Sequence, residues 1–189
     1  MTNQSNTIRI IAGTHRSRKV AFPDKAQIRP TGDRIRETLF NWIQQEVAGA
    51  LCLDLFAGSG ALGIEALSRS AGQAIFVETD PIIAAALSNN LKELQLDNSM
   101  VYQQDAQQWI ESNSGSDKFN IVFLDPPFDS ELLGKVTIAL ERSSILANQC
   151  LIYVEQAAPV SSDQIPSTWK LIKEKKAGNV FFYLYIRNG

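Results

Sequence analysis

From residue 50 onward, short apolar segments alternate with segments whose apolar residues recur at helical spacing. The apolar runs, each bounded by turn-forming residues, lie at 50–56, 74–78, 100–102, 119–124 and 150–155. Between them, the spacing predicts helices at 61–70, 81–94, 106–111 and 131–142. Short strands separated by helices are typical of βαβ units. The pattern therefore predicts an α/β fold with a mostly parallel sheet.

The end of the chain departs from this alternation. Residues 169–173 and 180–186 are strand-like, and they flank Gly178-Asn179, a pair that favours a two-residue turn. We therefore expect an antiparallel hairpin to complete the sheet.

The start of the chain departs from it as well. Two short strands are predicted at 8–12 and 19–22, joined by a basic loop. A helix is predicted to begin near Asp33, as its N-cap, and to run to about residue 46. We therefore expect a basic β-hairpin and linker at 1–32, followed by the main domain at 33–189.

Charge is distributed unevenly along the chain, which has 189 residues and a net charge of −2. Residues 1–40 contain eight Lys or Arg and three acidic residues, a local charge of +5, whereas the rest contains ten basic and 17 acidic residues, or −7. A basic arm on an acidic body favours a phosphate-bearing partner. The hairpin residues expected to contact a nucleic acid are Arg9, Arg16, Arg18 and Lys19.

Composition disfavours several other classes of protein. No apolar run approaches the roughly 18 residues of a membrane span, and no signal-peptide core is present. One histidine and two cysteines give no zinc pattern. Cys52 and Cys150 lie in apolar runs, as buried thiols of a reducing compartment do. We therefore expect a cytoplasmic protein with neither a membrane span nor a metal.

A glycine-rich segment from Asp54 to Gly63 closes the first strand of the main domain and opens the next helix. Glycines let the backbone turn tightly and approach a ligand, and the helix N-terminus offers free N–H groups. Glu78 follows at the end of the next strand, where its carboxylate can accept from both hydroxyls of a ribose. The candidate cofactor-binding residues are Asp54, Phe56, Ala57, Gly58, Ser59, Gly60, Glu78, Asp105 and Ala106.

The glycine pattern alone leaves two cofactors open, because three glycines followed by Glu78 also satisfy a dinucleotide fingerprint. Asp54 separates the two. Its negative charge is unfavourable beside the phosphates of NAD but attractive beside the ammonium group of S-adenosylmethionine. Asp105 follows the third strand, where it can accept from the adenine amino group or simply cap the next helix. The carboxyl ends of strands line the crevice of an open α/β sheet, so these acids are expected to converge.

A second segment, Asp125-Pro126-Pro127-Phe128, follows the strand predicted at 119–124. An aromatic amine is a poor nucleophile because its lone pair is delocalised into the ring. A carboxylate and a backbone carbonyl that accept its N–H groups can aim the lone pair at a sulfonium methyl group. The prolines remove competing N–H donors and stiffen the loop, and Phe128 can stack on the base.

These four residues are therefore the candidate catalytic residues of a methyltransferase that acts on an exocyclic amino group of a nucleobase. The methyl donor is already activated, so positioning and electrostatics are expected to supply most of the rate. A carboxylate suits the N1–H and N2–H donors of guanine, although adenine stays open on the residues alone.

The sequence resembles the bacterial ribosomal RNA small subunit methyltransferase D family, the guanine-N2 methyltransferases of 16S rRNA. The resemblance covers nearly the whole chain and is carried, in order, by Arg9–Gly13, Arg29–Phe40, Asp54–Gly60 and Asp125–Phe128. The segment Arg29–Phe40 is the specific one, because many methyltransferases share the last two.

The resemblance implies a Rossmann-like class I S-adenosylmethionine-dependent methyltransferase fold, with a seven-stranded, mostly parallel sheet and an N-terminal β-hairpin that engages RNA. It implies as substrate a guanine of 16S rRNA within an assembling small (30S) ribosomal subunit, and we expect a monomer. By the same likeness, Arg29, Thr31, Arg34 and Arg36 lie near the entrance and touch RNA or the edge of the cofactor, unless they only brace the helix.

The chain departs from that family at three positions. His15 stands where an aromatic residue such as Trp is usual, and Ser17 and Ser70 stand where Gly is common. These departures concern the basic hairpin and the end of one helix rather than the reaction.

Other functions remain as alternatives at this point. In the same class are a DNA adenine-N6 methyltransferase and a tRNA guanine-N2 methyltransferase. In different classes are an NAD-dependent oxidoreductase and a non-catalytic RNA-binding module. Asp54 and the proline loop argue against the oxidoreductase, and a binding module has no use for intact acids at Asp54, Glu78 and Asp125.

Overall fold

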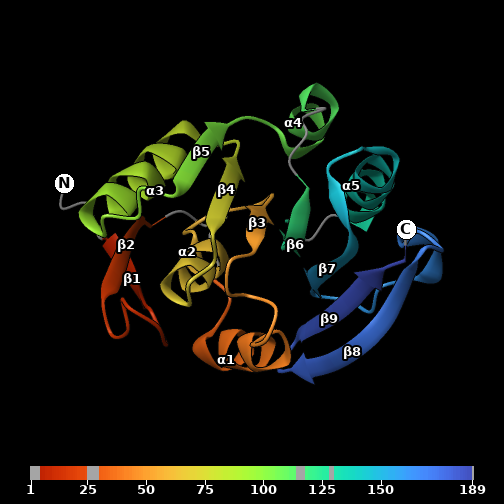
Figure 1. The fold of residues 1–189 in the computed structure, drawn as a ribbon, viewed down its shortest axis with the longest axis horizontal. Helices are drawn as coiled ribbons and strands as arrows, with labels where there is room; N and C mark the ends of the chain where they lie inside the picture. Colours follow the sequence, from red (N-terminus) through yellow and green to blue (C-terminus); the bar gives the residue numbers. More distant parts are fainter. Residues whose placement is uncertain (1–4, 25–29, 114–117, 128–129, 189) are drawn as a thin grey trace.

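A seven-stranded sheet organises the molecule, which a computed structural model describes at residues 5–24, 30–113, 118–127 and 130–188 (Figure 1). The strand order is β5-β4-β3-β6-β7-β9-β8. The pairs among β3 to β7 are parallel, whereas β9 runs antiparallel to both β7 and β8. The strands are β3 (Leu51–Asp54), β4 (Gln73–Glu78), β5 (Ser99–Gln103), β6 (Phe119–Leu124), β7 (Leu146–Gln156), β8 (Trp169–Ala177) and β9 (Val180–Arg187).

Helices cover both faces of this sheet because neighbouring strand residues point to opposite sides. Cys52 and Phe123 join one core with apolar side chains of α1, α2 and α3, whereas Leu53 and Leu124 join a second core with those of α4 and α5. The helices are α1 (Asp33–Trp42), α2 (Ala61–Ser68), α3 (Pro81–Glu93), α4 (Ala106–Ser112) and α5 (Ser130–Arg142), with a short 3-10 turn η1 (Ser162–Gln164). The predicted Rossmann-like α/β class is confirmed.

The order of the strands reverses beside β3. The chain passes from β3 outward to β4 and β5, and then returns to place β6 on the other side of β3. In open α/β sheets, ligands bind in the crevice at the carboxyl ends of the strands where the order reverses. Asp54 ends β3 and Asp125 follows β6, so both candidate segments lie at this point of the sheet.

The basic hairpin forms a separate two-stranded sheet of β1 (Ser5–Arg9) and β2 (Lys19–Pro23), with Arg9 opposite Lys19. Figure 1 shows it beside α3 and α2, at the end of the molecule away from β8 and β9. The amide of Asn90 on α3 donates to the carbonyl of Ala21 at 2.7 Å. The arm is therefore docked on the main domain.

Several boundaries differ from the prediction. The first strand ends at Arg9 rather than near residue 12, because the N–H groups of Ile11 and Ala12 donate to Glu65 instead of to a strand. The helix α1 has Gly32 as its N-cap, so Asp33 is its first residue, and it ends at Trp42 rather than near residue 46. The strand β7 begins four residues earlier than expected. The predicted turn at Gly178-Asn179 is confirmed, since Ala177 pairs with Val180.

Two of the departures from the family pattern fall on unusual backbone. Ser17 has φ 69° and Ser70 has φ 72°, both in the left-handed region that favours glycine. Gly13 in the same loop has φ +82°, and a Cβ there would lie 1.7 Å from the carbonyl oxygen of Ser68. The loop of the arm therefore lies directly against the end of α2.

Candidate active site and nucleic-acid interface

The glycine-rich segment forms a tight loop between β3 and α2. Gly58 and Gly60 have φ +50° and +77°, and Gly60 is the N-cap of α2. A Cβ at Gly60 would lie 2.4 Å from Cδ1 of Leu87, so this residue packs closely on α3. A Cβ at Gly58 would instead meet only the carbonyl oxygen of Phe56 at 3.9 Å, which leaves space in front of the loop.

Asp54 is nearly inaccessible, with 2% of its surface exposed. Its Oδ2 accepts from the N–H of Gly63 at 3.2 Å, within the first turn of α2. Burial raises the pKa of Asp54 to about 7; the backbone N–H of Gly63 opposes the rise and the charge of Glu78 adds to it. Asp54 is thus a buried carboxyl group whose charged form lacks solvation and would gain from a cationic partner.

The other acids predicted for the cofactor are held by backbone N–H groups. Glu78 accepts from Gly58 at 2.8 Å and from Asp80 at 2.9 Å, which ties the end of β4 to the glycine loop. Asp105 is the N-cap of α4, because its Oδ1 accepts from the N–H groups of Gln107 and Gln108. The capping alternative for Asp105 is therefore confirmed, while its contact with adenine stays a prediction.

The other predicted cofactor residues lie in the same loop, except Ala106, which begins α4. Ala57, Ser59 and Ala106 are buried, and Phe56 is half-buried. The N–H of Ala57 donates to the carbonyl of Val77 at 3.0 Å, so the loop is held against β4 as well as against α3.

The proline loop continues from the end of β6. Asp125 is partly exposed, Pro126 is buried and Pro127 is exposed, whereas Phe128 lies outside the described residues. The hydroxyl of Thr31 donates to Oδ2 of Asp125 at 3.5 Å. Burial raises the pKa of Asp125 well above its usual range. The charges of Glu155 and Asp54 raise it further, whereas the hydrogen bond from Thr31 lowers it.

Two further residues belong to this site and had no predicted role. Glu155 lies on β7 with 5% of its surface exposed, and Tyr153 donates its hydroxyl to Oε2 of Glu155 at 2.8 Å. Thr31 also forms a side-chain hydrogen bond with Glu155. In the sequence, Glu155 is an acid at the end of an apolar strand, and a buried acid ordinarily has a specific partner.

Thr31 was predicted to contact RNA, and its position requires a correction. It is 5% exposed and its hydroxyl faces Asp125 and Glu155, so it lies against the proline loop rather than on the outer surface.

The remaining predicted RNA-binding residues divide into two groups. Arg9, Arg16, Arg18, Lys19 and Arg34 are exposed, although Arg18 also donates to the carbonyl of Glu93 at 3.2 Å. Arg29 lies outside the described residues. The exposed group lies on or beside the hairpin and on the first turn of α1.

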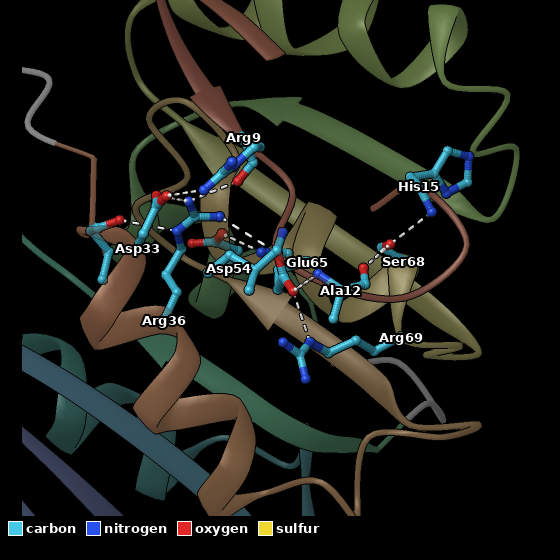
Figure 2. Close-up of polar contacts among 12 residues, drawn as sticks. Arg9, Ala12, His15, Asp33, Arg36, Asp54, Glu65, Ser68 and Arg69 are labelled. Atoms are coloured by element: carbon cyan, nitrogen blue, oxygen red, sulfur yellow. Dashed lines mark hydrogen bonds and ion pairs between the residues drawn. The ribbon is translucent and has the colours of Figure 1, made fainter. Parts of the chain in front are cut away.

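Arg36 is the clear error among the predicted RNA contacts, because it has 0% of its surface exposed. Figure 2 shows its guanidinium turned inward from α1, toward Asp33 and Glu65. Arg36 pairs with Asp33 at 2.6 Å and with Glu65 at 3.5 Å, and it donates to the backbone carbonyls of Arg9 and Thr31. Arg36 therefore braces the structure, as the alternative interpretation had it.

Glu65 is the centre of this internal network (Figure 2). It lies on α2, is fully buried, and accepts from the N–H groups of Ile11 and Ala12 at 2.8 and 3.0 Å. Arg69 also donates to it, at 2.8 Å. One carboxylate thus joins the arm to α2 directly and to α1 through Arg36.

The tip of the arm has a second attachment. The N–H of His15 donates to the hydroxyl of Ser68, which in turn donates to the carbonyl of Ala12 at 2.6 Å. The His15 ring bonds to the carbonyl of Leu94 through Nε2 at 2.9 Å. His15, although it replaces a usual aromatic residue, still fixes the loop against the main domain.

A groove of about 590 Å³ lies between the hairpin and the linker that precedes α1. Its lining includes Arg9 and Lys19 from the hairpin, Thr31 and Gly32 from the linker, and Asp33 at the start of α1. Thr31 lines this groove and also contacts Asp125, so the groove extends to a neighbour of the candidate catalytic acid.

Two features of other functional classes are missing from the described residues. They contain no helix that is long and apolar enough to cross a membrane. They also contain no group of three or more His, Cys, Asp or Glu side chains placed to hold a metal ion.

Comparisons with known proteins give a likeness along nearly the full chain. A family model described as Conserved hypothetical protein 95 matches residues 8–186. An Escherichia coli K12 protein named ribosomal RNA small subunit methyltransferase D is 45% identical over 97% of this chain and 91% of its own. The Haemophilus influenzae protein of the same name is 40% identical, over 97% and 95%. The solved structure of Escherichia coli yhhF has a TM-score of 0.89 at 44% identity, covering 97% of this chain and 99% of that one.

We predict that Glu65→Ala destabilises the protein by about 3 kcal/mol or more, because it leaves the buried Arg36 without its buried partner and two N–H groups of the arm without an acceptor. Urea unfolding measures the loss. The matched control is Lys135→Ala, which removes an exposed ion pair with Glu131 and should cost less than about 1 kcal/mol. Equal losses in the two variants would contradict the structural role of Glu65.

Proposed function

Because the chain belongs to the ribosomal RNA small subunit methyltransferase D family, we propose that it transfers a methyl group from S-adenosylmethionine to the exocyclic N2 of a guanine in 16S rRNA. By the same family resemblance the guanine is the one at position 966. Membership in a family of methyltransferases removes the oxidoreductase and the non-catalytic module from consideration. The observation that carries the proposal is the juxtaposition of Asp54 and Asp125 where the strand order reverses.

The glycine loop and its acids fit S-adenosylmethionine. The cofactor has an ammonium group, which a buried carboxylate at Asp54 complements. Glu78, fixed by two backbone N–H groups, suits the ribose hydroxyls, and Asp105 has both cap bonds on Oδ1, which leaves its Oδ2 for the adenine amino group. The open space before Gly58 suits a close approach of a ligand to the backbone. When bound, the cofactor supplies an activated methyl group.

Asp125 acts as the acceptor that orients the guanine. Its carboxylate accepts from the N1–H and N2–H donors of the base, so the N2 lone pair is turned out of the ring plane and toward the methyl donor. Pro126 and Pro127 provide a stiff backbone for this contact, since neither has an N–H group. Positioning of this kind is worth several orders of magnitude in rate.

RNA reaches this acid by way of the basic arm. Arg9 and Lys19 line the groove that extends to Thr31, and Arg16 lies exposed on the loop between the strands. Phosphate contacts of this type position an RNA strand without reading its sequence. The target guanine is then splayed out of its stack to meet Asp125, which costs least for a base in a loop or bulge. This recognition of folded RNA fits a substrate within a small-subunit assembly.

We predict that the affinity for S-adenosylmethionine rises as the pH is raised from 5.5 to about 7. The free carboxyl group of Asp54 has a pKa of about 7, so below that pH it must lose a proton before it can pair with the ammonium group. Calorimetry should show a loss of up to about tenfold per pH unit below 7. Asp54→Asn should bind weakly at every pH, whereas the exposed Asp97→Asn should match the wild type. A pH-independent affinity would refute the role of Asp54.

We predict that Asp125→Ala lowers methyl transfer at least about 100-fold while cofactor affinity stays within a few-fold of the wild type. Mass spectrometry of nucleosides from 16S rRNA is the readout, with N2-methylguanosine as the expected product of the wild type. Formation of a methylated adenine instead would overturn the choice of base. Normal turnover by the variant would overturn the role of Asp125.

We predict that the double variant Arg16→Glu, Lys19→Glu weakens RNA binding and flattens its dependence on salt. Every phosphate that the variant no longer neutralises lowers the slope of log K against log salt by roughly 0.7 to 0.9. Arg18 is left unchanged because it also holds the carbonyl of Glu93. Lys135→Glu, on α5, is the matched charge control. An unchanged slope in the double variant would remove the hairpin from the RNA interface.

A further inference from the structure

Glu155 is a buried acid for which the proposed reaction has no use so far. It lies on β7, which pairs in parallel with β6, and Leu124 on β6 is opposite Val154 on β7. The next residues, Asp125 and Glu155, therefore leave neighbouring strands side by side at the carboxyl end of the sheet. Only 5% of Glu155 is exposed, so its carboxyl group has little access to water.

One hydroxyl stands between these two acids. The Thr31 side chain donates to Oδ2 of Asp125 at 3.5 Å and also forms a hydrogen bond with Glu155. A hydroxyl has a single proton, so it can donate to only one carboxylate at a time. Glu155 has a second donor, the Tyr153 hydroxyl at 2.8 Å, which fixes its orientation.

The linker itself is held in place by Arg36. Its Nε donates to the backbone carbonyl of Thr31 at 3.1 Å, and its guanidinium is pinned by Glu65. The position of the Thr31 hydroxyl between the acids is thus set by the packed core rather than by a free side chain.

The charges around the pair are of one sign. Asp54 on β3 adds to the negative potential at Asp125, and Glu78 on β4 adds to that at Asp54. Within the described part of the chain, neither Asp125 nor Glu155 is ion-paired with a Lys, Arg or His side chain; Arg36 donates to the Thr31 carbonyl, but its ion pairs are with Asp33 and Glu65. The charge of Glu155 likewise raises the pKa of Asp125, because a second negative charge beside a carboxylate is unfavourable.

We propose that Glu155 is a positioning residue for Asp125: with the Thr31 hydroxyl between the two acids, it holds the Asp125 carboxyl group in place to accept the N–H groups of the target base. The proposal rests on the proposed function for the identity of that base. In this arrangement Thr31 and Tyr153 orient the two acids, Asp125 and Glu155, and neither takes part in the methyl transfer itself.

The test is Glu155→Gln, which has the shape of the protonated acid but no charge. Removing the negative charge of Glu155 lowers the pKa of Asp125, because a neighbouring like charge is one cause of its elevation. NMR titration of the Asp125 carboxyl carbon in the free protein should move to lower pH by roughly one unit. The acid limb of kcat/KM for RNA methylation should move in the same direction, with kcat above pH 8 within about threefold of the wild type.

Two further variants separate positioning from loss of folding. Thr31→Val should lower kcat at least about tenfold while cofactor affinity is kept, and Thr31→Ser should restore most of it. Glu141→Gln is the matched control, because Glu141 is an acid held by Arg187 and Trp169 away from the proline loop. It should leave both titrations unchanged.

The outcomes are distinguishable. An Asp125 titration that stays in place or moves to higher pH in Glu155→Gln overturns the inference, as does a Thr31→Ser variant no better than Thr31→Val. Absence of RNA methylation by the wild type overturns the proposed function instead, and the carboxyl titration then still decides whether Glu155 acts on Asp125.

Discussion

The arrangement of the arm, the linker and the proline loop depends on the interactions of one carboxylate, that of Glu65. It has no solvent contact, yet it accepts from two backbone N–H groups of the arm and pairs with two arginines. A buried ion pair seldom adds net stability, but removing one partner is costly because the other charge is left in the interior. The network is therefore better understood as a device that fixes one arrangement of three segments than as a source of folding energy.

That arrangement extends from the basic arm to Asp125. Glu65 holds the guanidinium of Arg36, Arg36 donates to the carbonyl of Thr31, and the hydroxyl of Thr31 reaches Asp125. Each step is a contact between groups whose geometry is set by packing. A displacement of the arm would thus be transmitted to Asp125 through three side chains, those of Glu65, Arg36 and Thr31. The same contacts make Thr31, just before α1, part of the site.

Local patterns in the sequence predicted much of the fold and part of the site. The alternation of strands and helices, the glycine loop after β3 and the proline loop after β6 were all predictable, because each depends on neighbouring residues. The turn at Gly178-Asn179 was predictable for the same reason. Pairing across the sheet follows from the order of such elements, so Asp54 and Asp125 could be expected at one edge.

Contacts between distant residues were not predictable in this way. Arg36 looked like one more cation in a basic segment, since nothing near it in the sequence shows that Glu65 would neutralise it inside the core. Glu65 lies in a helix with all eight residues buried, where helical periodicity gives no polar face to place it on. Ile11 and Ala12 had the composition of a strand but donate to that same carboxylate, which shortens β1. Burial turned each of these polar groups into a constraint, and that burial exists only in the assembled fold.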